Sequence, residues 1–173
     1  MSGMLFKYLE TDHKLIDEYL RRAIESPGNP DMTAYLQFRA SLLRHISIEE
    51  NFLFPPMLKA LNGKPLPVLA QIKLDHAALV ALLVPPPSRS IIAALHAILD
   101  KHNRLEEEDG GVYQILESLP ADELKALLEK ARSAPEVRMV PHKVSPEILD
   151  ATRRVLSRAG YTLSDYESAG EVR

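Results

Sequence analysis

Apolar residues recur at steps of three and four along four long stretches of the chain, which is the spacing of one buried face of an α-helix. These stretches cover about residues 2–25, 31–61, 66–84 and 88–106. No stretch alternates between apolar and polar residues as a half-buried strand does. The pattern therefore predicts four long helices.

The residues between these stretches are typical of helix ends. Thirteen prolines lie between the stretches or at their ends, where a missing backbone N–H is tolerated. We expect Asp31 or Thr33 to cap the second helix and Ser88 or Ser90 to cap the fourth. The pair Pro55-Pro56 predicts a kink in the second helix or its early end.

Shorter amphipathic stretches follow Pro120, at residues 121–131 and 146–159, and the polar tail after them is expected to be loose. With connections of about three to six residues, the long helices predict an all-α fold, an up-down-up-down four-helix bundle with additional short C-terminal helices. We predict two parts, a four-helix bundle over 1–119 and a C-terminal helical extension and tail over 120–173.

Composition narrows the class of protein. The 173 residues include 21 basic and 24 acidic side chains, a net charge of -3, which gives no basic surface for a nucleic acid. The chain has no cysteine, which excludes disulfides, thiolate nucleophiles and cysteine-held zinc or iron–sulfur clusters. Its longest apolar run, 77–84, is shorter than the roughly 18 residues of a membrane span, and the first ten residues do not form a signal peptide. We therefore expect a cytoplasmic protein with no nucleic-acid or membrane partner.

Each long helix carries one histidine on its apolar face: His13, His45, His76 and His102. A single histidine at such a position is usually a hydrogen-bonded core residue. Four of them are harder to explain in this way, because burying an imidazole without a partner costs about 1–3 kcal/mol. Counting along the helices at about 1.5 Å per residue places the four near one level of the bundle. The pattern indicates a shared partner, for which a metal ion is the obvious candidate.

Two of these histidines begin the same motif, His-x-x-x-Glu-Glu, at residues 45–50 and 102–107. Four residues along a helix bring His45 onto the same face as Glu49, and His102 onto the same face as Glu106. An isolated copy is usually a surface pair. Two copies, each preceded by a helix with its own histidine, form an internal pseudo-repeat of helical hairpins. Such a repeat supplies the terminal nitrogens and bridging carboxylates that a pair of metal ions needs.

On these residues the chain resembles the hemerythrin-like proteins with the HHE cation-binding domain. The matching segments are Asp12-His13, residues 45–55, Asp75-His76 and residues 102–107, and the resemblance covers about residues 5–118. It implies a four-helix bundle around a non-haem di-iron centre, with two carboxylate-bridged iron ions as cofactor. Zinc or manganese are the substitutes that histidine–carboxylate sites also accept. The ligands that the resemblance implies are His13, His45, His76 and His102 at the ends and Glu49 and Glu106 as bridges.

The chain departs from the family pattern at two places. Oxygen-carrying hemerythrins use five histidines, whereas the two remaining histidines here are expected outside the site: His96 on another helix face and His142 in a solvated loop. The segment 107–113, Glu-Glu-Asp-Gly-Gly-Val-Tyr, replaces the expected aromatic-proline ending. Its two glycines either bend the fourth helix, admit solvent or end the helix, at a cost of about 2 kcal/mol relative to alanine.

Three further acidic residues lie near the predicted ligands. Asp17, four residues after His13, is a candidate for orienting that ligand, for an additional ligand or for a surface position. Glu50 and Glu107 are expected to face solvent or their own helices. We expect the site to be enclosed by apolar side chains that exclude water, namely Phe6, Leu9, Phe38, Leu42, Phe52, Leu79, Leu99 and Leu105.

Three hypotheses of function follow. The first is a di-iron protein that binds or senses oxygen, nitric oxide or iron, with a small diatomic ligand as its partner. The second is an enzyme that activates oxygen or peroxide and protects against oxidative or nitrosative stress; the lack of cysteine counts against iron–sulfur repair. The third is a structural bundle with a vestigial site that forms a homodimer or binds a protein partner through its C-terminal helices.

Overall fold

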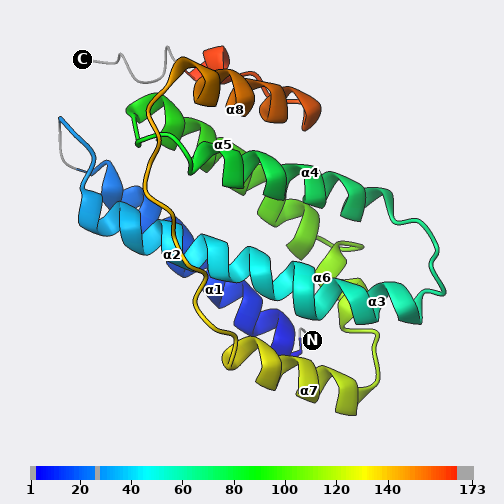
Figure 1. Cartoon of the computed structure of the whole chain (residues 1–173). Helices are drawn as coiled ribbons and strands as arrows, with labels where there is room; N and C mark the ends of the chain where they lie inside the picture. Colours follow the sequence, from blue (N-terminus) through cyan, green and yellow to red (C-terminus); the bar gives the residue numbers. More distant parts are fainter. Residues whose placement is uncertain (1–2, 26–27, 167–173) are drawn as a thin grey trace.

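The computed structural model describes residues 3–25 and 28–166, and within these ranges it is built from helices without a strand (Figure 1). None of the helices in these ranges is both long enough and apolar enough to cross a membrane. The elements are α1 (Met4–Ala23), α2 (Met32–Ile48), η1 (Glu49–Leu53), α3 (Phe54–Ala60), α4 (Pro67–Leu82), α5 (Arg89–Glu107), α6 (Val112–Leu116), α7 (Ala121–Arg132), α8 (Pro146–Arg158) and η2 (Leu163–Tyr166). The predicted all-helical class is therefore confirmed for the described residues.

Two helices, α2 and α5, begin at the capping side chains that the sequence predicts. The Asp31 carboxylate accepts hydrogen bonds from the backbone N–H groups of Thr33 and Ala34, which satisfies the free amides at the start of α2. The Ser88 hydroxyl accepts in the same way from the Ile91 N–H at the start of α5. The connection over 26–30, expected to end the first helix, follows α1, and its first two residues, Ser26 and Pro27, lie outside the described residues.

The second predicted helix continues past Pro55-Pro56 by means of a wide turn. α2 passes into η1, a π-helical turn in which the Phe54 N–H donates to the carbonyl of Glu49, and then into α3. Neither proline has an N–H to donate, and a proline ring clashes with the carbonyl four residues earlier in a regular α-helix. The wider turn removes this conflict, and it places Glu49 at its first position.

The buried apolar residues form two clusters with a polar layer between them. The first cluster packs the second half of α1 against the first half of α2, with α4 and α5. The second cluster joins the start of α1 to η1, α3, α6 and α7. Along α1 the buried residues pass from the second cluster to the first between Leu9 and Ile16. Along α4 they do so between Ile72 and Ala78. The polar layer at this level holds the four histidines that the sequence singles out.

Gly110 and Gly111 end α5 and turn the chain into α6. Gly110 has a φ of 84°, which favours glycine, and a Cβ at Gly111 would lie 2.6 Å from the carbonyl oxygen of Glu106. The turn therefore requires both glycines. Of the three outcomes predicted for this segment, the helix ends here, and α6 continues into the second apolar cluster.

The C-terminal part packs on its own chain at two separate places. α7 lies against α1 and η1, and α8 lies against α4, with an extended segment over 133–145 connecting them past α2 (Figure 1). The predicted loose tail is wrong for 161–166, because Tyr161 and Leu163 are buried in the first apolar cluster. The rest of that tail, 167–173, lies outside the described residues.

Candidate metal centre

The structure brings the four predicted histidines into two close pairs in the middle of the molecule. His13 on α1 and His45 on α2 have ring centroids 4.5 Å apart, and His76 on α4 and His102 on α5 have centroids 4.9 Å apart. All four side chains are buried. Within each pair the rings are tilted against each other, so that both Nε2 atoms face the space between the helices.

The carboxylates of Glu49 and Glu106 lie between the two pairs of histidines and are fully buried. Glu49 Oε1 is 3.4 Å from His45 Nε2, while its Oε2 is 3.2 Å from His76 Nε2. Glu106 Oε2 is 3.3 Å from His13 Nε2, while its Oε1 is 3.4 Å from His102 Nε2. Each carboxylate therefore presents one oxygen to each pair.

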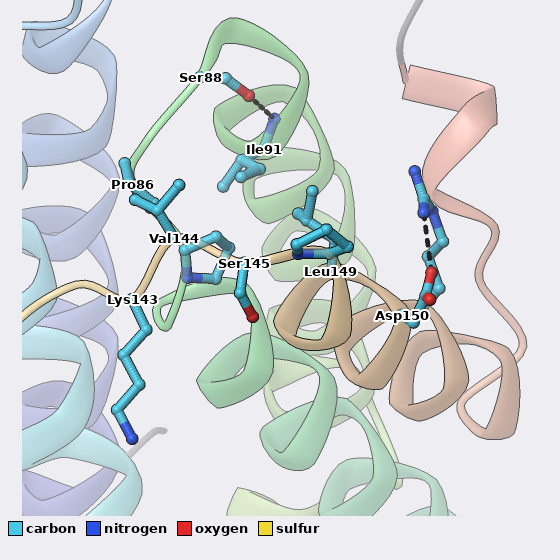
Figure 2. A pocket seen from close by; sticks show the side chains of 11 residues that line it. Pro86, Ser88, Ile91, Lys143, Val144, Ser145, Leu149 and Asp150 are labelled. Atoms are coloured by element: carbon cyan, nitrogen blue, oxygen red, sulfur yellow. Dashed lines mark hydrogen bonds and ion pairs between the residues drawn. The ribbon is translucent and has the colours of Figure 1, made fainter.

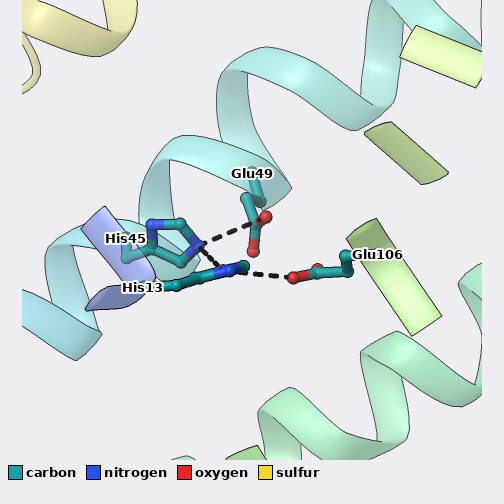
Figure 3. A group of neighbouring side chains, drawn as sticks. All are labelled: His13, His45, Glu49 and Glu106. Carbon is teal, nitrogen blue, oxygen red and sulfur yellow. Dashed lines mark hydrogen bonds and ion pairs between the residues drawn. The ribbon is translucent and has the colours of Figure 1, made fainter. Parts of the chain in front are cut away.

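These six residues form two groups of four donors that share both carboxylates. The first donor group is His13, His45, Glu49 and Glu106 (Figure 3), and the second is Glu49, His76, His102 and Glu106. In each group one ligand atom per residue lies within 4.8 Å of the others. Either group could hold a metal ion, because nitrogen and oxygen atoms at this spacing match the bonds of about 2.0–2.2 Å that such ions form.

Two more glutamates, Glu50 and Glu107, accept hydrogen bonds from the Nδ1 atoms of two histidines, on the side of each ring away from the donor groups. The Nδ1 of His76 donates to Glu50 Oε1 at 2.9 Å, and the Nδ1 of His13 donates to Glu107 Oε1 at 2.6 Å. These glutamates are partly exposed, as expected, but their carboxylates also bind histidines, a role that was not predicted. Each is the second glutamate of a His-x-x-x-Glu-Glu motif and reaches across to a histidine of another helix. The sequence supplies these residues, but it does not reveal how closely the helices that carry them pack.

Two aspartates face the outer nitrogens of the other two histidines. Asp12 Oδ2 lies 3.2 Å from His45 Nδ1, and Asp75 Oδ2 lies 3.8 Å from His102 Nδ1. Asp75 is fully buried, and its Oδ1 accepts hydrogen bonds from Tyr161 at 2.9 Å and from Gln71 at 2.8 Å. Three of the inward histidines thus have a hydrogen-bonded carboxylate behind them, which is the arrangement that orients imidazole ligands in metal sites. His102 Nδ1 faces Asp75 Oδ2 without a hydrogen bond to it.

Ion pairs between the buried histidines and carboxylates shift the pKa values of both more strongly than burial does. Burial by itself lowers the pKa of His45, but Glu49 and Asp12 outweigh it and raise this pKa to about 10. His76 is affected in the same way by Glu49 and Glu50, and its pKa rises to about 9. Burial opposes ionisation of Glu49, yet the two histidines hold its pKa well below the ordinary value. A metal ion that binds here must therefore displace protons from imidazoles.

Three donor atoms of the second group indicate that a cation fits. Glu49 Oε2, His76 Nε2 and Glu106 Oε1 are buried and form no well-aligned hydrogen bond among the described residues, although Glu49 Oε2 and His76 Nε2 lie at an ion-pair distance of 3.2 Å from each other. Leaving a buried polar atom unpaired costs about 1–3 kcal/mol, and more for a charged one. All three atoms belong to the same donor group, so one metal ion would satisfy them together.

A tyrosine that the sequence analysis does not identify enters the first donor group. The hydroxyl of Tyr113, on α6, donates to Glu49 Oε1 at 2.6 Å and lies 3.1 Å from Glu106 Oε2. Burial, with the charges of Glu106 and Glu49, raises the pKa of this phenol well above its ordinary value. The only signal in the sequence is the unusual Gly-Gly-Val-Tyr segment, because the turn that delivers the tyrosine depends on those glycines.

The other candidate residues lie outside the centre. Asp17 is exposed and 3.6 Å from His96, which is also exposed, so Asp17 takes the surface position among its three alternatives. His142 is not solvated as predicted, because its ring packs against Tyr35 and both of its nitrogens are buried. Of the predicted wall residues, Leu9, Phe38, Leu42, Leu79 and Leu99 are buried, and Phe6, Phe52 and Leu105 are partly buried.

A narrow cavity of about 10 Å³ borders the centre, which is room for one water-sized molecule. It is lined by His13, Ile16, Asp17, Leu42, His45, Leu99, His102 and Asn103. A surface hollow of about 370 Å³ shares four of these residues, namely His13, Asp17, Leu99 and Asn103. Solvent therefore reaches the edge of the histidine layer from this side.

A wider hollow of about 560 Å³ lies elsewhere, between the turn at Pro85-Pro86 and the start of α8 (Figure 2). Its walls are mainly apolar, with Lys143 and Asp150 at its edge. It shares no residue with either donor group, so it plays no part in the metal centre.

Comparisons with known protein families, with curated proteins and with solved structures gave no match to this chain.

Proposed function

We propose that this chain is a hemerythrin-like protein that holds two metal ions. His13 and His45 are the terminal ligands of one ion, and His76 and His102 are those of the other. Glu49 and Glu106 bridge the two. The observation that carries the proposal is that each buried carboxylate directs one oxygen to each histidine pair.

The proposed centre requires a particular arrangement of helices. We propose that α1, α2 with its continuation α3, α4 and α5 form an up-down-up-down four-helix bundle within residues 1–119. The contacts of α1 with α2, of α4 with α5 and of α1 with α5 support this arrangement. Residues 120–173 are then a helical extension on the outside of the bundle.

Iron is the metal we propose. Four histidines and two bridging carboxylates give each ion about four protein bonds, which leaves positions open for water or a small ligand. A pair of iron ions in such surroundings supplies reversible binding of small molecules and one-electron chemistry. The ligand set also accepts zinc or manganese, so the metal content of the protein decides between them.

The small cavity supports a diatomic ligand such as oxygen or nitric oxide. It has room for about one water-sized molecule, and three of the four histidines line it. The surface hollow beside it provides the approach from solvent. Larger organic substrates do not fit this space, which favours binding or sensing of a small ligand.

Metal analysis tests the proposal. The full chain, expressed with iron and freed of loosely bound metal, should contain about two iron ions, and Glu49→Ala or Glu106→Ala should remove nearly all of it. His96→Ala is the matched control, because His96 is exposed and outside both donor groups. Equal iron loss in the control, or a wild-type chain without tightly bound metal, would contradict the proposal. Peroxide consumption above that of free iron would favour the oxygen- or peroxide-activating enzyme instead.

A further inference from the structure

The hydroxyl of Tyr113 lies close to all four atoms of the first donor group. It is 2.6 Å from Glu49 Oε1, 3.1 Å from Glu106 Oε2, 3.0 Å from His13 Nε2 and 3.3 Å from His45 Nε2. A phenol donates one hydrogen bond, which Glu49 accepts here, and its oxygen can accept from an imidazole N–H. One hydroxyl proton cannot serve both carboxylates, and the approach to four nitrogen and oxygen atoms at 2.6–3.3 Å is also that of a ligand beside the other ligands of one ion.

The distances within this set of five atoms are those between neighbouring ligands of one ion. Two ligand atoms at right angles, each bound at about 2.1 Å, lie about 3.0 Å apart. Among the donors themselves, His13 Nε2 lies 2.9 Å from His45 Nε2 and 3.3 Å from Glu106 Oε2. The distances from the phenol oxygen to the donor atoms are therefore similar to the distances between the donor atoms themselves.

The phenol oxygen is farther from every donor atom than a bound metal ion would be. Its distances to the four atoms are 2.6–3.3 Å, whereas the bonds of such ions to nitrogen and oxygen are about 2.0–2.2 Å. It therefore lies at the spacing of a further ligand.

The second donor group has no such additional oxygen. Its atoms Glu49 Oε2, His76 Nε2 and Glu106 Oε1 form no hydrogen bond among the described residues, and the ring stacked on His76 is that of Phe54, which has no donor atom. The two groups, otherwise matched by the repeat of helical hairpins, thus differ by one oxygen. The difference arises from the Gly110-Gly111 turn, which directs α6 to the first group.

We propose that Tyr113 is a fifth protein ligand of the ion in the first donor group, which makes the two ions inequivalent. The inference rests on the proposed function. On coordination the phenol loses its proton to water, and the phenolate oxygen forms the bond to the metal. No electron is transferred in this step.

The spectrum of the iron(III)-loaded full chain tests this ligand. A phenolate bound to iron(III) has a charge-transfer band in the visible range, and Raman excitation within that band enhances the vibrations of the tyrosine ring. Tyr113→Phe should abolish both signals and still bind two iron ions. Tyr35→Phe is the matched control, because Tyr35 is equally buried but lies in the first apolar cluster, and it should retain both signals.

The outcomes separate the two proposals. Iron-loaded wild-type protein without the tyrosine vibrations, or a band that persists in Tyr113→Phe, would overturn the ligand while the metal centre stands. A wild-type chain that holds no iron would overturn both. If Tyr113→Phe does not fold, the wild-type spectrum still decides, because no hydroxyl of the other five tyrosines contacts either donor group among the described residues.

Discussion

At the scale of single residues, the carboxylates behind the histidines determine how well the imidazoles can serve as ligands. Glu107 and Glu50 accept from the outer nitrogens of His13 and His76, which selects the tautomer with a free Nε2 and aims that atom at the donor groups. A hydrogen-bonded imidazole is also a stronger base and a more rigid ligand. These residues therefore influence metal binding without touching the metal.

We predict that Glu107→Gln or Glu50→Gln weakens metal binding by about 10- to 100-fold, because a carboxamide is a weaker acceptor and does not favour one tautomer. Competition with a chelator of known affinity measures the change. Glu10→Gln is the control, since Glu10 only forms a surface pair with Lys14. Unchanged chelator competition in both variants would show that these glutamates do not support the ligands.

The raised pKa values of His45 and His76 predict how metal-free protein responds to pH. A raised pKa in the folded state stabilises the protein fully below the unfolded value near 6.5, and this stabilisation is lost as the pH rises through the folded values of about 10 and 9. The melting temperature of the chelated protein should therefore fall between about pH 6.5 and 10. Metal affinity should rise over the same range, because fewer protons compete.

Glu49→Gln supplies the control for this pH dependence. The variant removes the charge that Glu49 contributes to the pKa of both histidines, so its melting temperature should vary less over that range. Thermal unfolding at several pH values measures both curves. A wild-type curve that rises with pH, or curves of equal slope, would contradict the proposed pairing.

At the scale of elements, two irregular turns place the most important oxygens. The π turn at η1 lets the second helix continue across Pro55-Pro56 and begins at Glu49. The turn at Gly110-Gly111 ends α5 and brings α6, with Tyr113, over the first donor group. In both cases residues that disturb regular α-helix geometry, Pro55-Pro56 and Gly110-Gly111, lie a few positions from the site residue whose place they determine.

We predict that Gly111→Ala destabilises the protein by about 1–3 kcal/mol, as overpacking does, and displaces Tyr113. The new Cβ would lie 2.6 Å from the Glu106 carbonyl oxygen and 2.7 Å from that of Glu108, both of them backbone atoms. Urea unfolding measures the stability, and the visible band of the iron(III) form reports on Tyr113. Gly28→Ala is the control for the visible band: Gly28 has a positive φ, unlike Gly111, so alanine is strained there, but no atom lies within 4 Å of its added Cβ and the band should stay intact.

At the scale of the whole molecule, the candidate metal centre forms a polar layer between two apolar clusters, and the C-terminal segment contacts this layer from outside. Tyr161 donates to Asp75, 86 residues earlier, and Asp75 faces His102. Gln71 joins the same group by donating to Asp75 and to the carbonyl of Ala159. The extension after residue 120 therefore contributes to the support of a predicted ligand.

We predict that Tyr161→Phe lowers stability by about 1 kcal/mol and weakens metal binding at the second donor group by about tenfold, because Asp75 loses one of its two donors. Urea unfolding and chelator competition measure these effects. Tyr19→Phe is the control, since Tyr19 packs at the edge of the first apolar cluster away from Asp75. Metal binding unchanged in Tyr161→Phe would show that the extension and the centre are independent.

Much of this organisation could be predicted from local patterns. The helix boundaries follow from apolar spacing, caps and breakers, which act within one or two turns. His45 and Glu49 share a helix face for the same reason, as do His102 and Glu106. The pairing of Glu107 with His13, 94 residues apart, could not be predicted, because it depends on how closely two helices pack and how each is rotated.

By itself, then, the sequence determined the helices, the layer of inward histidines and the two motifs that supply carboxylates. Only the tertiary structure decided which carboxylate supports which histidine, that Tyr113 joins the first donor group and that Tyr161 holds Asp75. The physical reason is the separation along the chain over which the interactions act. Helix formation and the facing of side chains depend on neighbours along the chain, whereas a donor group exists only once distant helices have packed to within a few ångströms of one another.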